Sequence, residues 1–165
     1  MVKIIIEVRQ ALSDDLVSVA GIIEEAAAWL ESRGWPLWKD DELNRETMHS
    51  DIEAGLFFIG YCDGEPGGTI RYQQEDTLFW PDMPMGEAAY IHRIAVLRKY
   101  SGRELSQALV DWAAARAKSE GKKFLRLDCE QDRQKLRAVY EQFGFEYHSD
   151  RQVGPYHVAR YQRPL

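Results

Sequence analysis

The stretch that decides the fold is AYIHRIAVLRKYSGRELS, residues 89–106. It begins as an apolar, strand-like run, passes through a short basic turn at Gly102, and ends in the first turn of an amphipathic helix. The first N–H groups of a helix have no partner inside the helix, and the helix dipole places partial positive charge there. A strand that leads through a glycine turn into a helix therefore predicts a site for an anion, with phosphate as the natural ligand.

Basic side chains gather around the same turn, although the chain as a whole is acidic. Arg98, Lys99 and Arg103 lie close together in sequence, whereas the net charge is −6. A polyanion is repelled by the whole chain at long range, so this local positive charge strengthens the prediction of a phosphate site. The net charge also argues against a nucleic acid partner, because binding phosphate backbones needs a clustered basic surface.

Two segments resemble the acyl-CoA-binding core of the GNAT N-acetyltransferase superfamily. The first comprises the strand ending at 94–96, the turn 100–103 and the helix 105–118. The second is LRLDC at 125–129 followed by a helix ending in VYEQFGF at 139–145, which is similar to the family's Tyr-x-x-x-Gly-Phe ending. Together they cover residues 87–148, and the rest of the chain fits the family only in its pattern of elements.

The resemblance implies a fold and a reaction. The fold is mixed α/β, with a central, mostly antiparallel twisted sheet of about six to seven strands flanked by about four helices, in one domain over 1–165. The reaction moves an acetyl group from acetyl-CoA to a primary amine of a small molecule or peptide, by direct attack in a ternary complex. The alternative is a non-catalytic acyl-CoA or small-ligand binding module on the same fold.

The turn departs from the family's pyrophosphate pattern, which reads Gln or Arg, two residues, Gly, one residue, and then Gly or Ala. Ser101, Glu104 and Ser106 stand at these positions, and only Gly102 between them has the expected character. The site survives this change if Glu104 points outward, because the backbone N–H groups of the turn still face the ligand.

The resemblance also implies where acetyl-CoA binds. Backbone N–H groups of the strand would hold the pantetheine arm and the thioester carbonyl, where the strand splays from its neighbour, and those of the turn would hold the pyrophosphate. The predicted contacts are Ile94, Ala95, Val96, Ser101, Gly102, Arg103, Glu104, Leu105, Ser106 and Arg133. A buried strand with every N–H in its ladder is the alternative. Arg133 stands where many relatives carry asparagine, and either meets a cofactor phosphate or lies in solvent near Asp132.

Tyr140 is the candidate general acid, because it matches the tyrosine of the family's Tyr-x-x-x-Gly-Phe segment. A phenol has an ordinary pKa of about 10, so it holds a proton at neutral pH and can pass it to a leaving thiolate. Tyr140 also lies on the apolar stripe of its helix. Its alternative is therefore a core residue with a satisfied hydroxyl.

His92 is the candidate general base. Side chains alternate along a strand, so Tyr90, His92 and Ile94 are predicted to share one face. Many relatives use a glutamate on this strand to deprotonate the amine, and Tyr90 occupies the position that matches it best. Imidazole is the side chain that titrates near neutrality, which favours His92. Asp128, Glu87, a water chain and a purely structural histidine are the alternatives.

The region that shapes the acceptor pocket in the family is rich in aromatic and acidic residues, which suit a cationic or aromatic amine. These residues are Trp29, Trp35, Trp38, Phe79 and Trp80, beside Asp40, Asp41 and Glu42. Packing is the alternative role for the tryptophans.

The pair Arg126 and Asp128, two residues apart on one strand, is predicted to form a structural ion pair. The oligomeric state is expected to be a monomer or a homodimer.

The remaining sequence alternates between strands and helices. The predicted strands are 3–9, 56–62, 69–74, 88–97, 123–129, 145–148 and 158–162. The predicted helices run from an N-cap at Ser13 to Gly34 and over 42–53, 105–118 and 132–144. The stripe expected to bury the third helix comprises Leu105, Ala108, Leu109, Trp112 and Ala115.

The expected environment is the cytoplasm. No apolar run approaches the roughly 20 residues of a membrane helix, and the first residues do not resemble a secretory signal. Cys62 and Cys129 are far apart in sequence, which favours a reduced compartment over a disulfide framework. The four histidines form no recognisable ligand set, so we expect no metal.

Overall fold

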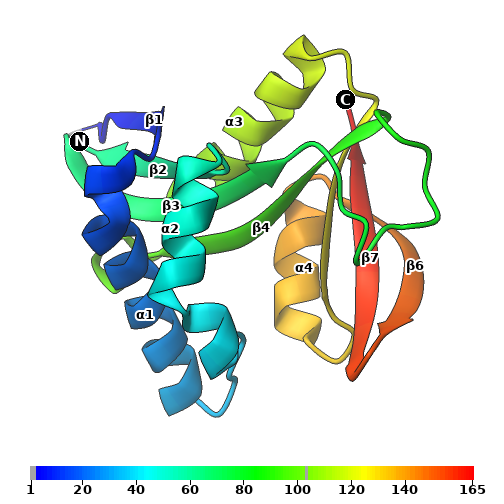
Figure 1. Ribbon diagram of the computed structural model, residues 1–165, viewed down its shortest axis with the longest axis horizontal. Coiled ribbons are helices and arrows are strands. Elements are labelled where there is room, and N and C mark those ends of the chain that lie inside the picture. Colours follow the sequence, from blue (N-terminus) through cyan, green and yellow to red (C-terminus); the bar gives the residue numbers. More distant parts are fainter. Residues whose placement is uncertain (1–2, 103) are drawn as a thin grey trace. The chain divides into compact units, whose positions relative to one another are not determined.

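The computed structural model describes residues 3–102 and 104–165 (Figure 1). Within these residues, one seven-stranded sheet has the order β1-β2-β3-β4-β5-β7-β6. The strands are β1 (Ile6–Gln10), β2 (Phe57–Cys62), β3 (Glu65–Gln73), β4 (Ala88–Val96), β5 (Phe124–Glu130), β6 (Glu146–Val153) and β7 (Tyr156–Pro164). Only β4 and β5 pair in parallel among the registers described, which confirms the predicted mixed fold with a mostly antiparallel sheet.

Four α-helices accompany the sheet within the described residues. They are α1 (Leu16–Ser32), α2 (Arg45–Glu53), α3 (Glu104–Ser119) and α4 (Gln134–Gln142). The chain divides into two compact units. The first comprises Met1–Arg71 and Arg93–Leu109, and the second comprises Tyr72–His92 and Val110–Leu165. The boundary crosses β4 between His92 and Arg93, so this strand contributes residues to both units.

The first unit packs α1 and α2 side by side against its strands (Figure 1). The core is a continuous apolar cluster from both helices, β2 and the end of β4. Its buried members are Ala11, Val19, Ala20, Ile22, Ile23, Met48, Ile52, Phe57, Ile59 and Ala95. Such a layer of helices on a sheet buries the apolar face of each element.

Both helices of the first unit begin later than the sequence pattern predicts. Ser13 is not an N-cap, because residues 13–15 form a short 3-10 turn in which Asp15 Oδ2 accepts from Leu12 N–H at 2.8 Å. The second helix begins at Arg45 rather than at 42, because the side chain of Asn44 caps it and accepts from the N–H of Glu46 at 2.8 Å.

The burial of α3 differs from the predicted stripe. Leu105 and Leu109 are buried as expected, but Ala115 is exposed. The buried positions after Leu109 are Val110, Ala113, Ala114 and Ala117. Alanine occupies several faces of this helix, so the apolar pattern alone does not determine which of them meets the core.

The second unit is built on antiparallel pairs of β5 with β7 and of β7 with β6. Its last two strands are longer than predicted, because β6 is an edge strand with polar, largely exposed residues that weaken the sequence signal. Strand β3 also begins earlier than the sequence pattern predicts, at Glu65. Pro66 and the following glycines are uncommon inside strands, so the pattern does not indicate a strand there. Across residues 3–102 and 104–165, no helix is long and apolar enough to span a membrane.

Candidate active site

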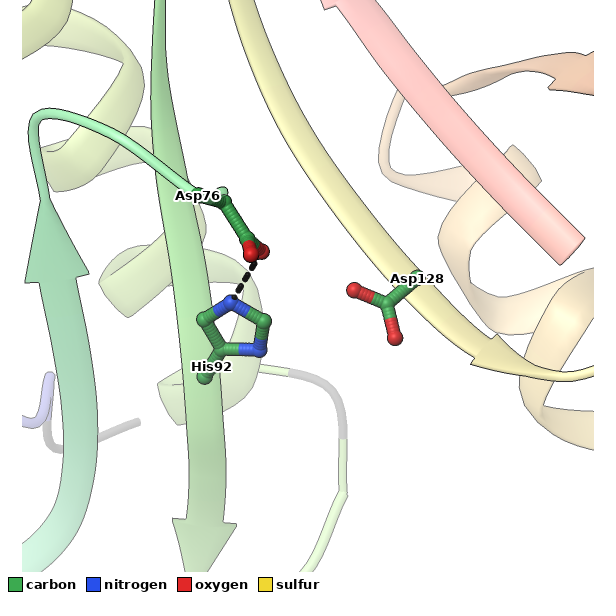
Figure 2. Close-up of side chains that lie close together, drawn as sticks. All are labelled: Asp76, His92 and Asp128. Atoms are coloured by element: carbon green, nitrogen blue, oxygen red, sulfur yellow. Dashed lines mark hydrogen bonds and ion pairs between the residues drawn. The ribbon is translucent and has the colours of Figure 1, made fainter. Parts of the chain in front are cut away.

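A histidine and two carboxylates meet in the second unit, as Figure 2 shows. His92 lies on β4, Asp76 on the loop that precedes it, and Asp128 on β5. The His92 Nε2 atom is 2.8 Å from Asp76 Oδ2. One nitrogen or oxygen atom from each of the three side chains lies within 4.8 Å of the others. The spacing of the histidines in the sequence gave no sign of this cluster, which is a candidate acid–base centre.

Asp76 is held as a carboxylate. Its Oδ1 accepts from Phe79 N–H at 2.9 Å, and its Oδ2 meets His92, so both oxygens are engaged. Burial acts to raise the pKa of Asp76, but the hydrogen bond and charge of His92, with the N–H groups of Phe79 and Leu78, outweigh it and lower the pKa. An ionised Asp76 accepts a proton-bearing Nε2, which leaves Nδ1 of His92 as the nitrogen that can take a proton.

Contacts with two buried arginines hold the loop that carries Asp76 in place. Arg160 is 3% exposed. It donates to Asp82 Oδ1 at 2.7 Å and to the Phe79 carbonyl at 3.1 Å, and its guanidinium lies 4.7 Å from the centre of the Trp80 ring. Arg126 lies 5.1 Å from the same ring. Trp80 thus packs between these arginines in this loop, in agreement with the packing role that was its alternative.

Asp128 is the least satisfied member of the cluster. Its Oδ2 is inaccessible to solvent and has no hydrogen-bond partner among the described residues. Burial raises the pKa of Asp128 to about 6. The predicted ion pair with Arg126 is wrong, because Arg126 donates to Glu87 Oε2 at 2.8 Å. The ion pair between Arg126 and Glu87 also occupies Glu87, which was one of the alternative general bases.

Tyr140 lies on α4 in the same unit and is half-buried. Its ring packs edge-on against Phe145, with ring centres 6.2 Å apart. Burial raises the pKa of the Tyr140 phenol, and the nearby Cys129 and Asp128 raise it further. The hydroxyl therefore keeps its proton at neutral pH, as a general acid requires.

In the first unit, β4 has an unusual backbone at Arg93. Its φ is +51°, a left-handed conformation that is rare for a residue other than glycine. The Arg93 carbonyl accepts from Thr69 Oγ1 at 2.9 Å, and its guanidinium donates to Glu42 at 2.8 Å. The simple alternation predicted from Tyr90 to Ile94 ends at this residue.

The parallel ladder of β4 and β5 is short. It comprises three residue pairs, from Ala88 with Phe124 to Tyr90 with Arg126. Strand β4 then continues to Val96, past the last of these pairs. The described pairs of this ladder end at Tyr90, four residues before Ile94.

The predicted phosphate turn follows β4. Gly102 has φ +128°, which only glycine adopts without strain. Glu104 is exposed in the first turn of α3, and Leu105 is buried. Ser106 is partly buried. Arg103 lies outside the described residues.

Contacts with β3 and α1 hold this turn. The Tyr100 hydroxyl donates to Glu65 Oε2 at 2.8 Å, and Lys99 Nζ donates to the same oxygen at 3.1 Å. The Arg98 guanidinium lies 3.8 Å from the centre of the Trp29 ring. Two of the three basic residues predicted to surround a phosphate thus have partners within the protein. Arg133, the remaining predicted contact, lies in the second unit and donates through Nε to Glu130 at 3.2 Å.

Replacing Gly67 by alanine is expected to displace the turn, because the new Cβ would lie 2.7 Å from Tyr100 Cδ2. Overpacking of this kind costs about 1–3 kcal/mol, and we expect acetyl-CoA affinity to fall at least about tenfold. Gly21→Ala is the matched control, since a Cβ there meets nothing within 4 Å. Calorimetric titration with acetyl-CoA measures both, and an unchanged affinity in Gly67→Ala would separate the turn from the binding site.

Comparison with known proteins finds relatives of this chain. The model of the acetyltransferase (GNAT) family matches residues 23–145. The uncharacterized N-acetyltransferase YesJ of Bacillus subtilis (strain 168) is 29% identical in an alignment of 144 residues that covers 83% of this chain and 79% of YesJ.

Solved structures have the same fold. A GNAT-family acetyltransferase from Listeria monocytogenes 4b F2365 is 25% identical, with a TM-score of 0.84 over 99% of this chain and 100% of that chain. The PaiA N-acetyltransferase of Thermoplasma acidophilum, solved in complex with coenzyme A, is 15% identical, with a TM-score of 0.74 over 98% of this chain and 99% of that chain.

Proposed function

We propose that this protein acetylates a primary amine by direct attack in a ternary complex. The chain belongs to the acetyltransferase (GNAT) family and is thereby an acetyl-CoA-dependent N-acetyltransferase. The observation that carries this proposal is the hydrogen-bonded pair of Asp76 and His92. An amine attacks a thioester only as the neutral base, so the reaction needs a group that accepts its proton. His92 stands two residues before Ile94 on the same strand.

Acetyl-CoA is proposed to bind along the segment from Ile94 to Ser106. Its pantetheine arm and thioester carbonyl would accept from backbone N–H groups of Ile94, Ala95 and Val96. This is supported by the left-handed Arg93 and by the short ladder between β4 and β5. The pyrophosphate would lie against the turn from Ser101 to the start of α3. The glycine conformation of that turn and the exposed Glu104 support this role.

The proton transfers follow from the charges of the second unit. His92 takes the proton of the amine through the nitrogen that does not face Asp76, and the ionised Asp76 orients the ring and stabilises the imidazolium. The amine lone pair then forms the C–N bond, and N–H groups of β4 stabilise the oxyanion. When the C–S bond breaks, Tyr140 donates its proton to the thiolate, and the second proton that the amine nitrogen loses as the amide forms restores the tyrosine through solvent. Asp76 is a positioning residue, whereas His92 and Tyr140 are the proposed catalytic residues.

The first test of this function is binding of acetyl-CoA. At a concentration 100 times Kd, a ligand that binds only the folded state stabilises it by about 2.7 kcal/mol, so we expect a clear rise in Tm. Adding a panel of primary amines with a thiol-sensitive dye should then release free CoA. The absence of any thermal shift at millimolar acetyl-CoA would contradict the binding, and a shift without CoA release on any amine would contradict the transfer.

A further inference from the structure

The carboxylate of Asp128 lies at the acid–base centre with an oxygen that nothing in the described chain satisfies. Its Oδ2 is buried and without a hydrogen-bond partner. Buried carboxylates in proteins are normally paired, because desolvating an unpaired charge is costly. In Figure 2 the Asp128 side chain points from β5 toward the His92 ring and Asp76. The arrangement is that of a binding position that a cation would complete.

We propose that Asp128 binds the primary ammonium group of the acceptor and holds it beside His92. The acceptor is therefore an aliphatic amine that arrives protonated. This proposal rests on the proposed function, because it assigns the acceptor class to the same site. The proton that the ammonium gives up passes to His92, which leaves the neutral amine that attacks.

The geometry suits an ammonium nitrogen. One atom each of Asp76, His92 and Asp128 lies within 4.8 Å of the others. A nitrogen that donates two hydrogen bonds of about 2.8 Å at a tetrahedral angle spans acceptors about 4.6 Å apart. A cluster of this size therefore has room for one ammonium group that donates to Asp128 and to His92 together.

The same geometry favours an ammonium over a divalent metal ion. A metal held by all three residues would compete with His92 Nε2 for Asp76 Oδ2, which lies 2.8 Å away, while Asp76 Oδ1 accepts from Phe79 N–H at 2.9 Å. An ammonium group needs only Asp128 and His92. It leaves the hydrogen bond between Asp76 and His92 intact, and the proposed transfer depends on that bond.

Asp128→Asn tests the proposal, because asparagine has the same shape without the charge. Asp132→Asn is the matched control, since Asp132 is exposed and provides no side-chain cap for α4. Using amines that release CoA in the parent, we expect KM for an aliphatic amine to rise at least tenfold in Asp128→Asn. KM for an aromatic amine, which is uncharged at neutral pH, should change less than twofold. Asp128→Glu, which restores the charge, should recover part of the affinity.

A second measurement does not depend on turnover. The imidazole NMR signals of His92 should shift when n-butylammonium chloride is added to the parent and to Asp132→Asn, and should not shift in Asp128→Asn. Failure of CoA release with an intact butylammonium response would contradict only the proposed function. An equal KM in parent and Asp128→Asn, or no butylammonium response in the parent, would overturn the ammonium site. Saturable broadening of the His92 signals by Mn²⁺ that is lost in Asp128→Asn and unaffected by butylammonium would overturn it in favour of a metal site.

Discussion

Tyr140→Phe is expected to lower kcat by about 10²–10⁴-fold, the usual scale for a general acid or base, while the Kd for acetyl-CoA changes little. The variant removes only the hydroxyl and keeps the ring that packs on Phe145. Because burial raises the pKa of the phenol, its proton is retained through neutral and mildly alkaline pH. The parent should therefore show no loss of kcat from this group below about pH 10.

Tyr147→Phe is the matched control for this experiment. Tyr147 is 50% exposed, and its hydroxyl donates to Asp150 at 2.7 Å, so its loss should leave kcat unchanged. Stopped-flow measurement of CoA release separates the chemical step from substrate binding. If Tyr140→Phe turns over like the parent, Tyr140 is a packing residue, and solvent or another group protonates the thiolate.

His92→Ala is expected to reduce kcat/KM by a similar factor, about 10²–10⁴-fold, and to abolish its decline at acidic pH. A proton on His92 blocks its action as a base, so the activity of the parent should fall as pH decreases. The acetyl-CoA thermal shift should persist, because the proposed contacts of the cofactor are mainly backbone groups of β4 and the turn. Activity as a function of pH, measured with parent and variant, tests both expectations.

Loss of the His92 ring also leaves Asp76 buried without its partner, so a second variant is needed. His92→Gln keeps an N–H donor for Asp76 and removes the titrating group, and it should be as inactive as His92→Ala but more stable. His49→Ala is the control, since the His49 side chain on α2 is 41% exposed and its Nε2 lies 3.4 Å from Glu53 Oε1. An acidic decline that moves with the pKa of the acceptor, or that survives in His92→Ala, would assign the titration to the amine.

Local sequence determines the part of the site that was predicted. The strand, the turn at Gly102 and the start of α3 follow one another within a single stretch, and glycine at φ +128° and an apolar helix face are short-range signals. The family resemblance added the expected reaction. The assignment to the family favours the enzyme over the binding module.

Long-range contacts determine the part that was missed. Asp76 lies in a loop whose path depends on Arg160, 78 residues from Asp82 along the chain. The only local sign was an aspartate able to accept from an N–H three residues later, a pattern common in turns. The lack of a partner for Asp128 Oδ2 could likewise not be predicted from the sequence. Its expected partner, Arg126, instead donates to Glu87 and to the Tyr90 hydroxyl.

The way in which the loop that carries Asp76 is held in place affects how the set of amines that the enzyme accepts can change. Arg160 and Trp80 hold the loop by buried contacts, whereas Thr77, Leu78 and Met85 of the same loop are exposed. Substitutions at these three positions can alter what the loop presents to an incoming molecule without moving Asp76. Directed evolution for a new amine should therefore accumulate changes at Thr77, Leu78 and Met85, while Arg160, Trp80 and Asp82 stay unchanged.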